Sequence, residues 1–89
     1  MKEIADRLVK IYEEKNRLYG NSFSELYDEL GPISAITQIL HKSNRLKALV
    51  KTFDIEAIKD TLIDLANYSM MTLQEIEERE QFPKDNTKY

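Results

Sequence analysis

The stretch between Asp54 and Pro83 is the most regular part of the chain, because it holds neither glycine nor proline and repeats apolar residues at helical spacing. We predict a long helix from Ile55 to about Glu80, with Asp54 as its N-cap. Its core-facing stripe is expected to consist of Ile55, Ile58, Leu62, Leu65, Ala66, Leu73 and Ile76. The length of 89 residues predicts a single domain.

Three more helices are expected upstream, and the only two glycines of the chain separate them. The first covers residues 2–19 and ends at Gly20, since glycine readily takes the conformation that terminates a helix. The second is short and begins at Ser22, which forms a capping-box pattern with Glu25. The third starts at Pro32, because proline is well suited to the first turn of a helix, and extends to about residue 50.

These elements predict an all-α fold, a small four-helix bundle-like domain over residues 1–82 with a short second helix. Residues 83–89 are predicted to form a flexible, polar tail. A domain of this size buries a thin core, so a homo-oligomer is expected to supply further apolar contact.

Composition narrows the class of protein. There is no cysteine, so disulfides, thiolate metal sites and cysteine chemistry are excluded. No apolar run resembles a signal peptide or a membrane span, which predicts a cytoplasmic protein without membrane association. The net charge of −3 argues against non-specific nucleic-acid binding, although local cations are still able to hold a small phosphorylated ligand.

The long helix carries a polar stripe formed by Glu56, Asp60, Asp64 and Asn67, at steps of four, four and three residues. One interpretation is a solvated acidic face. The other is a functional face, since the residues beside the stripe are largely apolar and stacked carboxylates suit a hard cation such as Mg²⁺. On the second interpretation Asp60 and Asp64 are candidate metal ligands, and Asn67 and Tyr68 are candidate ligand-binding residues.

The third helix offers positive charge. His41, Lys42 and Arg45 are candidates to hold phosphate oxygens, and the arginine is best suited because its planar fork binds two oxygens at once. The alternative is a surface strip or a structural ion-pair network. His41 is the only histidine and has no serine or cysteine partner in sequence, so a catalytic triad is not supported.

The connection between the first two helices is the third candidate. Lys15 and Tyr19 lie four residues apart and therefore share a face of the first helix. Asn21 and Ser22 follow at a helix entrance, where free backbone N–H groups attract anions. The alternative is a turn with its cap. Glycine-rich phosphate loops are absent, which disfavours the usual ATPase and dinucleotide-binding chemistry.

Three stretches, KNRLYGNSF, HKSNRLKALV and IKDTLIDLANYSMMTL, together resemble the family called nucleotide modification associated domain 1. The resemblance covers roughly residues 12–76. It implies a setting in phages or in bacterial genomes with phage-derived regions, and a link to the metabolism of modified nucleotides. It implies no particular activity.

The segment DTLIDLANY is also distantly similar to the second metal-binding helix of the all-α nucleoside triphosphate pyrophosphohydrolases of the MazG and dimeric dUTPase group. This similarity implies Mg²⁺ ligation by Asp60 and Asp64 and substrate contact by Asn67. The glutamate pair of that group is replaced here by the basic residues around Lys42, which disfavours hydrolysis.

We therefore rank three hypotheses. The first is a phage-associated protein that binds a nucleotide or nucleotide-like ligand, in nucleotide metabolism or counter-defence, and that acts in the host cytoplasm if it is phage-encoded. The second is an inhibitor that binds a host defence protein without any small ligand. The third is a Mg²⁺-dependent nucleotide pyrophosphohydrolase with a reduced site. Because this hypothesis is ranked last, we favour a protein that is not an enzyme.

Overall fold

The computed structural model describes residues 1–81 and contains four helices, α1 (Lys2–Tyr19), α2 (Ser22–Leu30), α3 (Pro32–Val50) and α4 (Ile55–Gln81). No strand occurs within these residues, so the prediction of an all-α fold with a short second helix is confirmed. The tail predicted over residues 83–89 lies outside the described residues.

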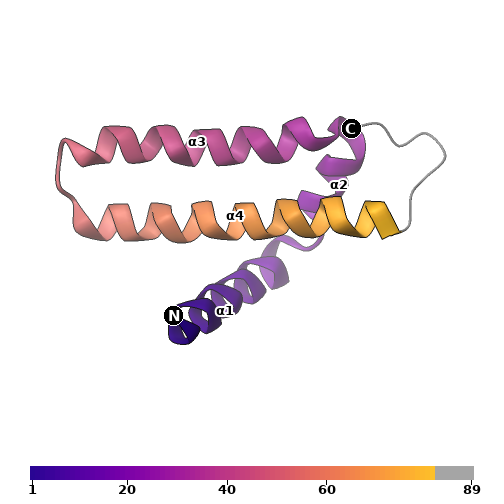
Figure 1. Ribbon diagram of the computed structural model, residues 1–89, viewed down its shortest axis with the longest axis horizontal. Helices are drawn as coiled ribbons and strands as arrows, with labels where there is room; N and C mark the ends of the chain where they lie inside the picture. The colour runs from indigo at the N-terminus through magenta and orange to yellow at the C-terminus, as the bar shows by residue number, and fades with distance from the viewer. Residues whose placement is uncertain (82–89) are drawn as a thin grey trace.

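Helices α3 and α4 lie side by side and antiparallel, and they form the long hairpin on which the other two helices pack (Figure 1). Helix α2 packs against α3 near the start of that hairpin. Helix α1 contacts α4 and projects away from the hairpin at an angle (Figure 1). The result is an elongated molecule with extents of 48 × 26 × 24 Å.

Local sequence signals explain where the helices begin and end. Gly20 and Gly31 adopt positive φ angles of 66° and 79°, which a residue without a Cβ atom accepts at low cost. Pro32 opens α3, where its missing N–H removes no helical hydrogen bond. The carboxylate of Asp54 accepts a hydrogen bond of 3.1 Å from the backbone N–H of Ala57, as expected for the N-cap of α4.

The capping box predicted at the start of α2 is wrong. Asn21 occupies the N-cap position without a side-chain capping bond, and Ser22 is already the first helical residue. The hydroxyl of Ser22 therefore lies one position too far along the chain to cap the free N–H groups.

Burial differs from the predicted pattern in α4. Within residues 1–81, only two hydrophobic residues are fully buried, Tyr27 and Ala35, and four polar residues of α4 join them: Thr61, Asn67, Thr72 and Glu75. By contrast, Ile55, Leu62 and Leu73 of the predicted core stripe are 59%, 49% and 55% exposed. For these three residues the predicted stripe is wrong within one copy of the chain, since α4 turns its polar side inward.

Two of the buried polar residues are threonines whose hydroxyls form hydrogen bonds within α4 itself. Thr61 donates to the carbonyl of Ala57 at 2.8 Å, and Thr72 donates to the carbonyl of Tyr68 at 2.6 Å. Because a hydroxyl bonded to the carbonyl one turn earlier needs no partner elsewhere, the two threonines can face the interior at little cost.

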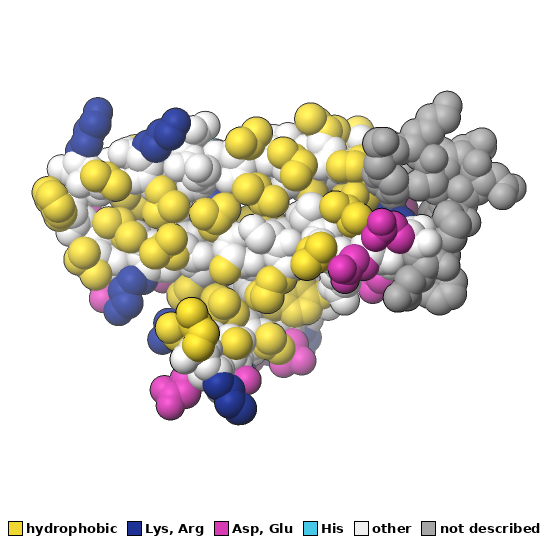
Figure 2. Space-filling model, in the orientation of Figure 1, with side chains coloured by type: hydrophobic (Ala, Val, Ile, Leu, Met, Phe, Trp, Pro, Cys, Tyr) yellow, Lys and Arg dark blue, Asp and Glu magenta, His cyan; other side chains and the backbone are white. Residues whose placement is uncertain are grey.

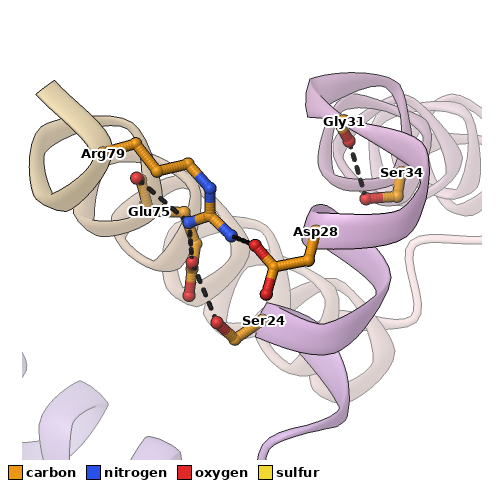
Figure 3. A network of polar contacts seen from close by, with 6 residues as sticks. All are labelled: Ser24, Asp28, Gly31, Ser34, Glu75 and Arg79. Carbon is orange, nitrogen blue, oxygen red and sulfur yellow. Dashed lines mark hydrogen bonds and ion pairs between the residues drawn. The ribbon is translucent and has the colours of Figure 1, made fainter. Parts of the chain in front are cut away.

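Glu75 is held by a network that joins α4 to α2 (Figure 3). Arg79 donates to Glu75 one turn earlier on α4 and to Asp28 on α2, while Ser24 of α2 donates to Glu75 at 3.1 Å. The guanidinium also lies over the ring of Tyr27, 4.3 Å from its centroid. We call these residues the α2–α4 clamp, because charge-assisted bonds link the two helices across a sequence separation of about fifty residues.

Over the part of the chain that the structure describes, none of the helices combines the length and the hydropathy needed to cross a membrane.

Candidate ligand-binding site

Asp64 of α4 lies between two lysines that come from different helices. The ammonium group of Lys15 on α1 lies 2.9 Å from Oδ1 of Asp64, and that of Lys42 on α3 lies 3.1 Å from Oδ2. The side chains of Lys42 and Asp64 are 19% and 24% exposed, whereas that of Lys15 is 55% exposed. One carboxylate thus holds two cations side by side, and the three groups together carry a net charge of about +1.

The ion pair between Lys15 and Asp64 shifts the pKa values of both of these groups. Burial alone would raise the pKa of Asp64, but the hydrogen bonds from Lys15 and Lys42 outweigh it, so this pKa lies below its ordinary value. The hydrogen bond to Asp64 raises the pKa of Lys15 above its ordinary value. Near neutral pH Asp64 is therefore a carboxylate and Lys15 a charged ammonium group.

The three charged residues line a cavity of about 460 Å³ between the helices. Four aromatic rings also line it, those of Tyr12, Tyr19, Phe23 and Tyr68. The remaining polar side chains around it are those of Asn16, Ser22, Ser34, Gln38 and Asn67. Its volume falls within the range of about 300–1000 Å³ that is usual for small-molecule sites, and its lining combines aromatic surface with a few convergent polar groups.

Asn67 and Tyr68 of α4, together with Phe23 of α2, line one part of the cavity. The rings of Phe23 and Tyr68 stack with their centroids 6.1 Å apart and an angle of 29° between their planes. Asn67 is only 7% exposed, and its buried Oδ1 finds no hydrogen-bond partner within residues 1–81. A buried acceptor without a partner costs free energy, so a donor supplied by a ligand would stabilise this position.

The structure brings together most of the residues selected from the sequence. Of the predicted ligand-binding residues, Lys15, Tyr19, Lys42, Asn67 and Tyr68 all line the cavity, as does the predicted metal ligand Asp64.

Three predicted site residues lie elsewhere. His41 and Asp60 are exposed and are not part of the cavity lining. Arg45 donates through Nε to the hydroxyl of Thr61 at 3.2 Å, a contact between α3 and α4 outside the cavity. The polar stripe of α4 is therefore divided, with Glu56 and Asp60 in solvent and Asp64 and Asn67 facing the neighbouring helices.

The separation of exposed Asp60 from Asp64 also affects the predicted magnesium site. Both oxygens of Asp64 are paired with lysine ammonium groups, and Asp60 is exposed. Within residues 1–81, no group of three or more His, Cys, Asp or Glu side chains is placed to hold a metal ion. Binding of Mg²⁺ by Asp60 and Asp64 stays a prediction.

Sequence reasoning did not select several residues of the lining, notably Tyr12 and Phe23. Both residues recur at helical spacing with apolar neighbours, and aromatic residues in such positions are usually core residues. One available signal was the spacing of Tyr12, Lys15 and Tyr19, since positions three and four residues apart share one face of α1.

The fold and the cavity together define a small all-α protein with an open, mixed cationic and aromatic cavity that all four helices line. The family model named nucleotide modification associated domain 1 matches residues 15–76, which is most of the chain. The chain belongs to this family. No curated protein and no solved structure matches it.

Proposed function

We propose that this protein binds a nucleotide or a nucleotide-like phosphorylated ligand in the cavity between its four helices. The observation that carries the proposal is the pairing of Lys15 and Lys42 on one carboxylate at the edge of an aromatic cavity. The name of the family, which refers to nucleotide modification, supports the same class of ligand.

The phosphate end of the ligand is assigned to the two lysines. Each ammonium group has three N–H donors, and one contact to Asp64 leaves others for phosphate oxygens. Asp64 holds the two cations near each other, which lowers the entropy lost when both contact the same ligand. The net positive charge of the three groups favours an anion over a neutral ligand.

The base or sugar end is assigned to the aromatic part of the cavity. Phe23 and Tyr68 offer ring faces of the kind on which nucleobases stack. The buried Oδ1 of Asn67 is an acceptor suited to an amino group on the ligand. Such a binder would serve modified-nucleotide metabolism or, if the chain is phage-encoded, counter-defence by sequestering a nucleotide signal.

The test is isothermal titration calorimetry with mononucleotides, dinucleotides and cyclic nucleotides, each measured with and without Mg²⁺. For a ligand that binds, Lys15→Gln and Lys42→Gln are expected to weaken binding about 10- to 100-fold each, since a hydrogen bond to a charged group contributes roughly 1.5–3 kcal/mol. Matched controls are Lys10→Gln on α1 and Lys47→Gln on α3, which remove exposed lysines outside the cavity and should leave the affinity unchanged.

The proposal fails if no member of the set binds, or if the cavity variants bind as tightly as their controls. Chromatography of the nucleotide after incubation separates binding from hydrolysis, because a binder returns it intact. Cleavage only with Mg²⁺ would favour the pyrophosphohydrolase hypothesis. Absence of any ligand would favour a protein partner.

A further inference from the structure

One face of the α3–α4 hairpin is apolar and uncovered. It carries exposed hydrophobic residues on both helices, and we call these the apolar face: Ile36, Leu40 and Val50 on α3, and Ile55, Leu62 and Leu73 on α4. Figure 2 shows hydrophobic side chains gathered over both helices, with charged side chains at the margins. A hydrophobic centre with a polar rim is the usual composition of a protein–protein interface.

The chain exposes far more surface than a monomer of its mass. Its accessible surface is 7044 Å². A folded monomer of 10.5 kDa is expected to expose about 5400 Å², so the surplus is about 1600 Å². Obligate homodimers cover roughly 1000–2500 Å² on each partner, and the surplus lies within that range.

We propose that the apolar face is the contact between two copies of this chain. The two hairpins would pack face to face, so that α3 and α4 of both copies form a four-helix core. A two-fold arrangement places the same face on both partners, and this is the commonest symmetry of soluble oligomers. The surplus is large enough to accommodate a contact of the size that a stable dimer needs.

The neighbourhood of Leu73 offers a place for side chains of the second copy. A further hollow lies between α1 and α4, and Val9, Met70 and Leu73 contribute its apolar lining. Glu77 and Glu78 lie at the same hollow and supply charge beside it. The hollow therefore lies between α1 and the part of α4 that carries Leu73 of the apolar face, and apolar residues of the partner can insert into it.

This arrangement also explains the inward polar side of α4. Within one copy, α4 buries Thr61 and Thr72 while Leu62 and Leu73 remain about half exposed. In the dimer, α4 is covered on both sides, by its own chain on the polar side and by the partner on the apolar side. A helix with little solvent-facing surface in its centre is what its sequence, apolar around much of its circumference, indicates.

The first experiment is sedimentation velocity on the purified full chain at several concentrations. We expect twice the monomer mass for the wild type, and monomer mass for Leu62→Glu, since a buried carboxylate at the contact is strongly unfavourable. The matched control is Leu18→Glu on α1, a leucine that is 72% exposed and outside the apolar face. The control should retain the wild-type mass.

A second pair of variants keeps the test valid if Leu62→Glu does not fold. The chain has no cysteine, so Leu62→Cys and Leu18→Cys each introduce a single thiol of small volume. With an aromatic disulfide reagent, we expect Leu62→Cys to react at least 10-fold more slowly than Leu18→Cys. A monomeric wild type, a dimeric Leu62→Glu or equal thiol reactivity would each overturn the proposal and assign the face to another occupant.

Discussion

Asp64 shows how one residue can link three helices of this protein. Its two oxygens pair with lysines from α1 and α3, and the carboxylate itself lies on α4. The pairs are partly buried, so solvent screens them less than exposed pairs on the surface. We therefore expect Asp64 to contribute to stability as well as to the proposed ligand site.

The lowered pKa of Asp64 predicts how this contribution depends on pH. The contribution is present above the ordinary carboxyl pKa of about 4, and it is lost as the pH falls through the lower value of the folded state. The raised pKa of Lys15 extends this stabilising contribution to alkaline pH. There the contribution is lost only as the pH rises through the raised pKa of Lys15. Between about pH 5 and pH 9 the pair should add no pH dependence of its own.

Thermal unfolding of Asp64→Asn, followed by circular dichroism from pH 7 to pH 2, checks this prediction. The variant should melt below the wild type at pH 7, and the difference in Tm should shrink as the pH falls below 4. Asp60→Asn removes an exposed carboxylate one turn earlier and should show little difference at any pH. If the difference in Tm between Asp64→Asn and the wild type stays constant down to pH 2, the prediction that the stabilisation by Asp64 is lost at low pH is contradicted.

At the scale of elements, the α2–α4 clamp fixes the short helix. Helix α2 has nine residues, and helices of that length are marginal in isolation, so its stability depends on tertiary contacts. Arg79 supplies several of these contacts at once, since it pairs with Asp28 and Glu75 and stacks on Tyr27. The side chains of Arg79 and Glu75 are 14% and 11% exposed, so neither charge is well solvated.

Replacement of Arg79 by methionine should therefore be costly, because it leaves Glu75 buried without its cation. We expect Arg79→Met to lower the free energy of unfolding by about 3 kcal/mol. Arg17→Met is the control, since Arg17 pairs with Glu14 on α1 at an exposed position, and its loss should change stability by less than about 1 kcal/mol.

Urea unfolding measures the change in the free energy of unfolding for both Arg79→Met and Arg17→Met. The double variant Glu75→Gln with Arg79→Met should recover part of the loss, since it removes the unpaired carboxylate. Equal effects of Arg79→Met and Arg17→Met would show that the clamp contributes nothing beyond an exposed pair.

At the scale of the whole molecule, the interior of one copy is sparse. Two hydrophobic residues are fully buried within residues 1–81, and large apolar side chains of α1, α3 and α4 are exposed. Since apolar burial is the main favourable contribution to folding, a single copy has little to offset its loss of conformational entropy. We expect folding and association to be coupled.

This coupling predicts that stability depends on concentration. For a protein that folds as a dimer, Tm rises with protein concentration by mass action, whereas the Tm of a monomer does not. Differential scanning calorimetry over a 100-fold range of concentration should show a rise of several degrees for the wild type. The Leu18→Glu control should follow the same rise, and a Tm independent of concentration would contradict coupled folding.

The sequence by itself determined the four helices and nearly all of their limits, because these depend on local interactions. Gly20, Gly31, Pro32 and Asp54 act within a few residues of their own position, so their effects can be predicted without the rest of the fold. The sequence also contained five of the cavity residues that we selected for ligand binding, since their faces follow from helical spacing. Family membership likewise follows from the sequence.

Only the tertiary structure decided which side of α4 faces inward. Helical periodicity identifies an apolar stripe through Leu62 and Leu73, but it does not say whether the same chain or another one covers that stripe. It also does not reveal that Lys15 lies against Asp64, 49 residues away, or that Arg45 contacts Thr61 outside the cavity. These contacts depend on how the helices cross, and crossing is set by packing between side chains that are distant in the sequence.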